Sequence, residues 1–230
     1  MLAGVFEYRA CRAVALNLAI SLITVVSALP IRAGTLSVAP VVALLPVMIA
    51  MIAGAVSATY LGTAFVHRIS EELLKRIILV LLVVAGTGLI VEAFLPQEVT
   101  GLLPDALEVR LLAALLFGLA IGLVSSLLGV AGGELVIPTL LFAFGADVKT
   151  AGTANLLISL PTVAVGVVRH ARLKAFDERL DLTQTVAPMG VGSVIGAVAG
   201  GLLVGLVPAA ALKLVLGVIL IVSAVRIFRG

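Results

Sequence analysis

Residues 118–138 read GLAIGLVSSLLGVAGGELVIP, and this stretch decides how the rest of the chain can fold. An apolar run ends at Leu128, three glycines follow within residues 129–133, and a shorter apolar run begins at Leu135, directly after Glu134. Backbone N–H and C=O groups find no water in hydrocarbon, so unwound backbone persists in a membrane only inside protein or beside a watery cavity. Secondary transporters use such broken helices to aim a half-helix N-terminus at an anion. The stretch therefore predicts a glycine-broken helix with a functional break.

The same glycines also fit a purely structural role. Gly118 and Gly122 are four residues apart, and so are Gly129 and Gly133. Small residues at this spacing let membrane helices approach closely. The sequence leaves both interpretations open, and we favour the functional break.

The composition allows few classes of protein. Of 230 residues, 62% are hydrophobic and 12% are charged, and the mean hydropathy is +1.32. A soluble domain with this composition lacks the polar surface that it needs, and the continuous apolar runs exclude a transmembrane β-barrel. A single cysteine, Cys11, excludes an intrachain disulfide and a multi-cysteine metal site. We therefore predict an all-α polytopic membrane protein without a cofactor or a bound metal.

About eight transmembrane segments are expected. They are residues 10–29, 38–65, 73–95, 109–128, 135–144, 150–168, 183–204 and 209–228. All but one have roughly the 20 residues that cross a hydrocarbon core. The exception, 135–144, is predicted to be a half-helix or one arm of a re-entrant hairpin. Basic residues mark cytoplasmic loops, so the basic loop 169–181 and both chain ends are expected in the cytoplasm of a cell-membrane protein, with the acidic segment 96–108 outside.

An internal repeat indicates the arrangement of these segments. Residues 13–21 (AVALNLAIS) match 151–159 (AGTANLLIS) at an offset of 155 − 17 = 138. Further on, the series Pro46, Ala50, Gly54, Ala58 matches Pro188, Gly192, Gly196, Gly200 at an offset of 188 − 46 = 142. Matched segments run in opposite directions under the expected topology, which predicts an inverted-repeat bundle. The small residues at every fourth position are expected to face protein.

The repeat divides the chain into three parts. Residues 1–96 form a first repeat, 97–108 an external linker, and 109–230 a second repeat that contains the glycine-broken helix 118–138. The first repeat lacks a counterpart of the glycine-broken pair. We interpret this as a shortened first half or a misplaced start codon.

The segment from Gly129 to Pro138, GVAGGELVIP, is followed by Gly145 and by Ala-Gly-Thr at 151–153. This order resembles the TauE/SafE sulfite-exporter family of membrane permeases, whose members carry Gly-Leu-x-x-Gly-Leu-x-Gly-x-Gly-Gly-Gly…Pro and then Ala-x-Gly-Thr-Ser, typically once in each half. Here Glu134 follows the glycines, so a third glycine is absent, and the first half has no copy of the element. The resemblance implies a secondary transporter for sulfite, thiosulfate or organosulfonate-type anions, often coupled to protons.

The candidate site is a set of hydrogen-bond donors for an oxyanion around the break. The predicted substrate-binding residues are Ser125, Ser126, Gly132, Gly133, Glu134, Thr153, Asn155 and Ser159, together with Asn17 and Ser21 from the matched segment of the first repeat. Asn155 and Ser159 are four residues apart, so they share one helix face. The alternative for each single side chain is a hydrogen bond to a neighbouring helix.

Glu134 has two competing interpretations. An ionised carboxylate deep in a membrane costs about 2.5–3.5 kcal/mol even on the lenient scale, so it needs a role or a set of bonds. As a cap, it would satisfy N–H groups at the half-helix start. As a proton-coupling group, it would take up a proton and lose the charge that repels an incoming anion. The sequence does not decide between the two.

Three functions compete. The first is the secondary transporter, with a small anionic substrate and the lipid bilayer as its partners. The second is a non-transporting membrane subunit that packs against a partner. The third, a membrane-embedded enzyme, is disfavoured because the two histidines, His67 and His170, are far apart and no paired acids suit a metal. Basic residues without interleaved aromatics give no sign of nucleic-acid binding, and a homo-oligomer is left open.

Overall fold

The computed structural model describes residues 10–35, 39–65, 71–94, 101–128, 133–172 and 185–229. Within these ranges the regular structure is helical throughout, which confirms the all-α prediction. The helices are α2 (Ala10–Thr35), α3 (Ala39–Ala43), α4 (Leu45–Phe65), α5 (Glu71–Phe94), α6 (Leu107–Leu128), α7 (Gly133–Phe142), α8 (Val148–Arg172), α10 (Ala187–Leu206) and α11 (Ala209–Arg229).

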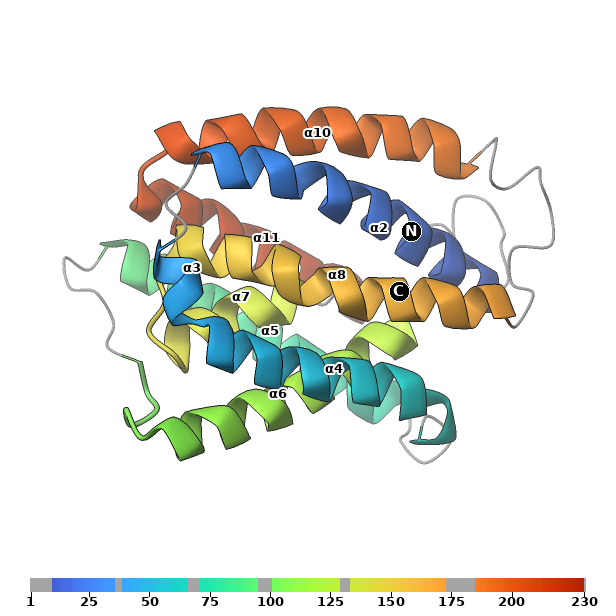
Figure 1. Ribbon diagram of the computed structural model, residues 1–230, viewed down its shortest axis with the longest axis horizontal. Helices are drawn as coiled ribbons and strands as arrows, with labels where there is room; N and C mark the ends of the chain where they lie inside the picture. Colours follow the sequence, from blue (N-terminus) through green and yellow to red (C-terminus); the bar gives the residue numbers. More distant parts are fainter. Residues whose placement is uncertain are drawn as a thin grey trace.

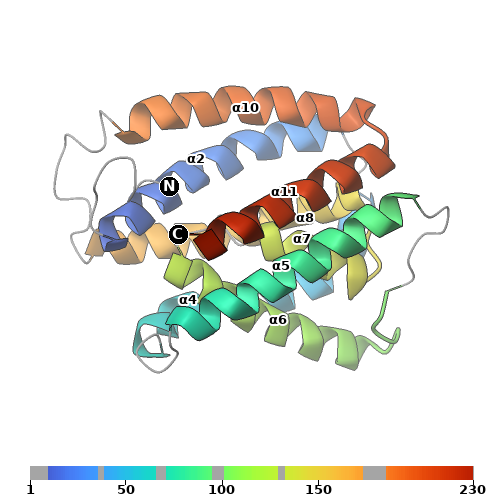
Figure 2. The same ribbon diagram turned by 180° about the vertical axis from the view of Figure 1, so that it is seen from behind.

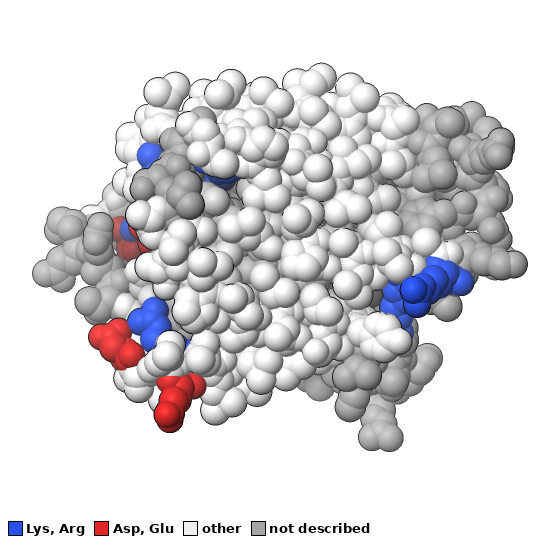
Figure 3. All heavy atoms as spheres, viewed as in Figure 1, with Lys and Arg blue, Asp and Glu red and all other residues white. Residues whose placement is uncertain are grey.

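Several of these helices suit a bilayer. Four described stretches are long and apolar enough to cross it, namely Ala15–Gly34, Leu107–Ser125, Val148–Arg172 and Ala187–Leu206. Shorter apolar helical stretches are Leu45–Tyr60, Leu82–Phe94 and Ala209–Val225. Charged side chains gather at the two ends of the molecule, with a broad uncharged band between them (Figure 3). The chain is therefore a helical membrane protein, while the number of eight spans stays a prediction.

Helix α8 lies between α2 and α4, with α11 behind it in the view of Figure 1 (Figures 1 and 2). It packs against α2, α3, α4, α7 and α11. Its buried face is built largely from small residues, and its hydroxyl groups bond within the helix, as when Thr162 Oγ1 donates to the Ile158 carbonyl at 2.9 Å. Such back-bonding satisfies a buried hydroxyl without a partner helix. Helix α8 can therefore carry several hydroxyl groups on its buried face.

The short helix expected after the glycine break is present. Helix α6 ends at Leu128, and α7 begins at Gly133 and has 10 residues. At 1.5 Å per residue this is about 15 Å, roughly half of a hydrocarbon core. The chain then turns at Gly145, whose φ of 69° suits glycine, and the N–H groups of Gly145 and Ala146 bond to the carbonyls of Leu141 and Leu140.

Helices α4 and α6 meet with their backbones in contact. A Cβ atom added at Gly118 would collide with the Met51 carbonyl oxygen, and one added at Gly122 would collide with the Ala55 carbonyl oxygen. From the other side, a Cβ at Gly54 would collide with the Leu115 carbonyl oxygen. The packing role of Gly118 and Gly122 is therefore confirmed.

The prediction that Gly192, Gly196 and Gly200 face protein is wrong. No described atom lies within 4 Å of a Cβ placed at any of the three. Helix α10 instead packs on α2 through Gly190 and Gly201, where an added Cβ would lie 3.1 Å from Ile23 Cδ1 and 2.7 Å from Ile31 Cγ2. Eleven residues span about three helical turns, so these two glycines share a face, whereas Gly192 is turned about 200° away from Gly190.

Matched glycine variants test this packing. Gly118→Ala should destabilise the fold by about 1–3 kcal/mol, because the added methyl group forces the backbones of α4 and α6 apart. Gly196→Ala should leave stability unchanged or raise it slightly, since nothing described lies near that position and alanine favours helix. The measurement is the melting temperature of each variant in detergent. Equal melting temperatures would contradict the backbone contact.

Candidate functional site

The start of α8 carries one of the predicted polar side chains, Thr153, beside polar groups that were not predicted. Asp147 caps the helix: its Oδ1 accepts the backbone N–H of Lys149 at 2.9 Å and that of Thr150 at 3.0 Å. Such a cap satisfies two of the N–H groups that a helix start leaves open. Thr153 Oγ1 donates to the Lys149 carbonyl at 3.1 Å. The Ala-Gly-Thr element at 151–153 therefore occupies the first turns of a capped helix.

Arg32 of α2 lies across this helix start. Its Nη1 is 3.4 Å from both the Lys149 carbonyl oxygen and Thr153 Oγ1, at the limit of a hydrogen bond. A Cβ at Gly152 would lie 3.1 Å from Arg32 Nη1, so the glycine makes room for the guanidinium. Arg32 was not among the predicted site residues. Its signal in the sequence is a lone basic residue at the end of an apolar segment. When that segment pairs antiparallel with the segment that carries Ala-Gly-Thr, the basic residue lies beside the Ala-Gly-Thr element.

Asn155 and Ser159 share a face of α8, as expected. Ser159 Oγ donates to Asn155 Oδ1 at 3.1 Å, and Ser159 is only 2% exposed. These side chains thus bond to each other within one helix. Whether they also face a substrate stays a prediction.

Asn17 and Ser21 lie on α2, which runs antiparallel to α8. Arg32 meets Gly152 at one end of this contact, and Leu18 meets Gly166 at the other, with Leu18 Cδ1 3.2 Å from a Cβ placed on Gly166. Gly166 is eleven residues beyond Asn155, or about 16 Å along the helix. Asn17, next to Leu18, therefore lies at the opposite end of the contact from Asn155. Asn17 and Asn155 therefore do not belong to one cluster.

The remaining predicted residues flank the glycine break. Ser125 is buried near the end of α6. Gly133 is the first residue of α7 and Glu134 the second, so Glu134 lies in the first turn of the short helix. Gly132 and the side chains of Ser126 and Glu134 lie outside the described parts of the chain. The assignment of a cap or a coupling role to Glu134 stays a prediction.

A buried ion pair between α5 and α11 was not predicted. Lys213 Nζ lies 2.6 Å from Glu92 Oε1, and the side chains are only 15% and 7% exposed. Glu92 Oε2 is buried and has no hydrogen-bond partner among the described residues. Charges within membrane helices are expensive and commonly functional. The sequence carried a signal, because each residue is a lone charge near the end of an apolar segment and the two charges have opposite signs.

Glycines bring these two helices together. A Cβ at Gly86 would lie 2.8 Å from the Gly217 carbonyl oxygen, and one at Gly217 would lie 2.7 Å from the Gly86 carbonyl oxygen. The ion pair lies one to two turns from this crossing. Close backbone approach thus holds Glu92 and Lys213 within reach of each other.

The described residues contain no group of three or more His, Cys, Asp or Glu side chains that could hold a metal ion. The groups near the start of α8 are the Arg32 guanidinium, the Thr153 hydroxyl, which donates to the Lys149 carbonyl, and the Asp147 carboxylate, which accepts two backbone N–H groups. Of these, the guanidinium suits an oxyanion.

Comparisons with known proteins agree with the resemblance seen in the sequence. The family model of the sulfite exporter TauE/SafE matches residues 114–230. A probable membrane transporter protein of Methanocaldococcus jannaschii is 30% identical over 121 residues, which cover 50% of this chain and 44% of the relative. The match thus spans less than half of that relative's length. No solved structure matches the chain.

The buried ion pair leads to a stability prediction. Lys213→Met should destabilise the fold by about 3–5 kcal/mol, because it leaves the Glu92 carboxylate buried without its cation. The matched control is Asp105→Asn, which breaks a 3.0 Å pair with Arg110 whose carboxylate is fully exposed; exposed pairs contribute little. Chemical or thermal unfolding in detergent measures both. A double variant, Glu92→Leu with Lys213→Met, should recover most of the loss, and failure to recover would contradict the unpaired-charge explanation.

Proposed function

Because the chain belongs to the sulfite exporter TauE/SafE family, we propose that it is a secondary membrane transporter for small oxyanions of the sulfite, thiosulfate or organosulfonate type. The matched relative is named a probable membrane transporter protein. Family membership also weighs against the membrane-embedded enzyme. The contact of Arg32 with the start of α8 is the main structural support for an anionic substrate.

This contact brings two positive features together. The guanidinium of Arg32 lies beside Gly152 and Thr153, within the first two turns of α8. The positive end of the α8 dipole lies at the same place. A guanidinium presents a planar fork of donors that matches a sulfur oxyanion. An anion beside Arg32 would therefore meet favourable donor geometry, although the N–H groups of Lys149 and Thr150 at this helix start are already bonded to the Asp147 carboxylate.

The glycine break is the second part of the proposed site. Donors for an oxyanion would come from Gly132, Gly133 and Glu134 at the start of α7 and from Ser125 and Ser126 at the end of α6. Thr153, Asn155 and Ser159 would line the route along α8, with Asn17 and Ser21 on α2 toward its other end. Because these groups are spread along α8, we infer successive contacts along a path rather than a single cluster.

The inverted repeat is the proposed frame for this path. Three observations support it. Helices α2 and α8 are antiparallel. The matched pairs α4 with α10 (Figure 1) and α5 with α11 (Figure 2) also run in opposite directions. Thr24 and Thr162, which are 162 − 24 = 138 residues apart, each donate to the carbonyl four residues earlier at 2.9 Å. We propose residues 1–96 and 109–230 as the two repeats, with 97–108 between them.

The orientation follows from charge. Arg169 and Arg172 end α8, and Arg76 lies near the start of α5, which itself begins at Glu71, so three arginines of the described chain lie at this end of the bundle. The opposite end carries Asp105, Glu108 and Asp147 beside its basic residues. The positive-inside rule then places the arginine-rich end, with both chain termini, in the cytoplasm.

One observation favours the alternative of a membrane subunit that packs against a partner. The small-residue face of α10 has no described neighbour, whereas the matching face of α4 is covered by α6. Reconstitution separates the two functions. Purified protein in liposomes should take up labelled sulfite if it is a transporter, and should not if it needs a partner.

Arg32 is the first residue to test in that assay. Arg32→Gln should reduce sulfite uptake by about tenfold or more, since a charge-assisted contact is worth about 1.5–3 kcal/mol. Arg110→Gln is the matched control, because Arg110 bonds to Asp105 and to the Phe144 carbonyl rather than to the start of α8. Equal uptake by the two variants would remove Arg32 from the substrate path.

Glu134 is tested by its pH response. Glu134→Gln should abolish the pH dependence of uptake while the protein still folds, because glutamine keeps the size of the side chain and an oxygen that accepts N–H bonds. A wild-type pH profile in this variant would exclude proton coupling through Glu134. It would leave only the capping role.

A further inference from the structure

The contact between α5 and α11 joins the two proposed repeats, and the proposed substrate path does not use it. Helix α5 belongs to residues 1–96 and α11 to residues 109–230, and the two helices are antiparallel (Figure 2). In inverted-repeat transporters one repeat rocks against the other, which opens the substrate site to one side of the membrane at a time. A motion of this kind must rearrange the contact between α5 and α11.

This contact has a crossing point at two glycines. The backbones touch at Gly86 and Gly217, where an added Cβ would lie 2.8 Å or 2.7 Å from the carbonyl oxygen of the facing glycine. Packed helices ordinarily interlock through ridges and grooves of side chains. Because neither glycine contributes a ridge, tilting about this point disturbs fewer side chains than tilting elsewhere along the contact would.

The glycine crossing divides each helix into two arms. The paired arms, residues 87–94 of α5 and 209–216 of α11, contain the ion pair between Glu92 and Lys213. The remaining parts of the two helices are the opposite arms. Glu92 and Lys213 are six and four positions from the glycines, or about 9 Å and 6 Å along their helices. An attraction at that distance from the crossing pulls the paired arms together.

The internal repeat does not reproduce this pair on the opposite arms. Lys213 matches Lys75 at the repeat offset (213 − 75 = 138). Glu92 matches Gly230 (230 − 92 = 138), which has no side chain. The pair is therefore a feature of one end of the bundle, the end where α8 begins.

The pair is also placed so that it can open. Glu92 Oε2 is buried and has no hydrogen-bond partner among the described residues, so the closed pair leaves one acceptor unsatisfied. Glu92 is two residues before the end of α5 and Lys213 is four residues after the start of α11, which puts both within about 6 Å of a helix end. When the paired arms separate, water at the membrane surface hydrates both charges, which offsets the loss of their attraction.

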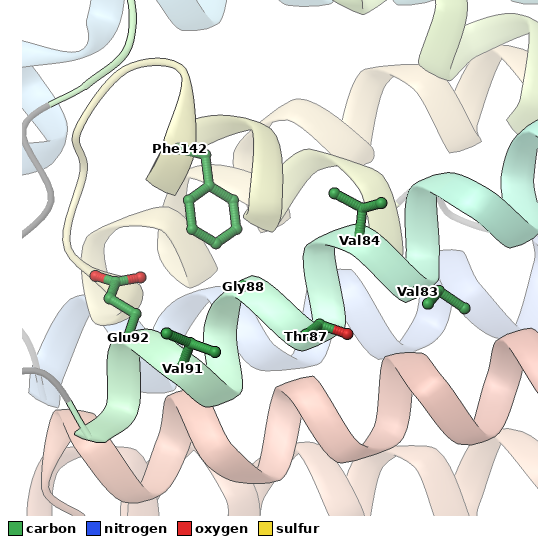
Figure 4. Close-up of a pocket in the computed structure, with 7 residues that line it drawn as sticks. All are labelled: Val83, Val84, Thr87, Gly88, Val91, Glu92 and Phe142. Carbon is green, nitrogen blue, oxygen red and sulfur yellow. The ribbon is translucent and has the colours of Figure 1, made fainter.

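Phe142 connects the paired arm of α5 to the short helix α7. Its ring points toward Gly88, where an added Cβ would lie 2.9 Å from the ring Cζ (Figure 4). Gly88 lies between the crossing at Gly86 and the ion pair at Glu92, so a movement of this arm is passed to the end of α7. The other end of α7 is Gly133, at the glycine break.

We propose that the Glu92–Lys213 pair is a latch that holds the transporter closed at the end of the bundle where α8 begins. Breaking the pair lets the paired arms part about Gly86 and Gly217, and α7 moves with α5. The latch rests on the proposed function, because transport is what requires the two repeats to move. The separation of the arms is nevertheless measured without a substrate.

Spin labels measure that separation directly. The native cysteine, Cys11, is first replaced by serine. Cysteines at Phe94 and Ala210 then report on the paired arms, and cysteines at Val80 and Val225 report on the opposite arms. All four positions are exposed, so the labels do not enter the core. The measurement is the distribution of distances between the two labels, taken by pulsed electron resonance on the full chain in lipid nanodiscs.

The test variant lacks the latch but keeps the fold. Glu92→Leu with Lys213→Met should be about as stable as the wild type, because no unpaired charge is left. We expect a second population on the paired arms with the labels about 3 Å farther apart, since a tilt of about 15° moves a point about 12 Å from the crossing by that amount. The distance on the opposite arms should not increase. The control, Asp105→Asn, breaks an exposed ion pair and should leave both distances unchanged.

Wild-type distances on the paired arms of the double variant would overturn the latch. Equal lengthening on both pairs of arms would also overturn it, because that result indicates a loosened bundle. If the double variant does not fold, Glu92→Gln is measured in its place, since it removes the charge and keeps the size of the side chain. The same two outcomes then decide.

Sulfite uptake by the wild-type protein separates this inference from the proposed function. Longer distances in the double variant without wild-type uptake would support the latch and contradict sulfite transport. Wild-type uptake with unchanged distances in the double variant would contradict the latch and support the transporter.

Discussion

Backbone contact between α4 and α6 is the constraint on which the bundle depends. Gly54, Gly118 and Gly122 remove side chains from the interface, so the carbonyl oxygens of one helix reach the backbone of the other. In lipid, helices gain little from hydrophobic burial, and close van der Waals contact is what remains to hold them together. This contact brings the first part of the chain against the helix that precedes the glycine break. The short α7 then returns from that fixed point to the start of α8.

The position of α8 also depends on close packing at glycines. Gly152 accommodates the guanidinium of Arg32, and Gly166 accommodates Leu18, so α2 can lie along α8 over much of its length. Hydroxyl groups on α8 bond back to its own carbonyls or to each other, which lets a helix with several polar residues sit inside the bundle. The polar groups of the proposed path are therefore carried by the helix with the most described neighbours.

Each described basic residue at the end of the bundle where α8 begins makes a hydrogen bond or an ion pair. Lys149 Nζ donates to the Gly205 carbonyl, Arg110 pairs with Asp105, Lys213 pairs with Glu92, and Arg32 contacts α8. The Arg110–Asp105 pair ties the loop before α6 to that helix. The other contacts join segments that are far apart in the sequence. At the opposite end, Arg169 donates to the Thr59 carbonyl and so ties α8 to α4. Charged side chains near the helix ends thus hold neighbouring helices together.

Composition and the length of the apolar runs alone predicted a helical membrane protein. A chain so poor in charge suits lipid, and in lipid an α-helix satisfies the backbone N–H and C=O groups within one segment. The glycines within 129–133 and the short apolar run after them likewise predicted a half-helix, and the pairing of Asn155 with Ser159 followed from helical spacing. Only the tertiary structure decided which glycine stripe is buried. The α4 stripe meets α6, whereas the equivalent α10 stripe faces outward, because α10 is rotated to place Gly190 and Gly201 on α2. Spacing specifies that residues share a face, but the direction of that face depends on neighbours far away in the sequence. The Glu92–Lys213 pair and the Arg32 contact have the same origin, since each joins helices more than 100 residues apart in the chain.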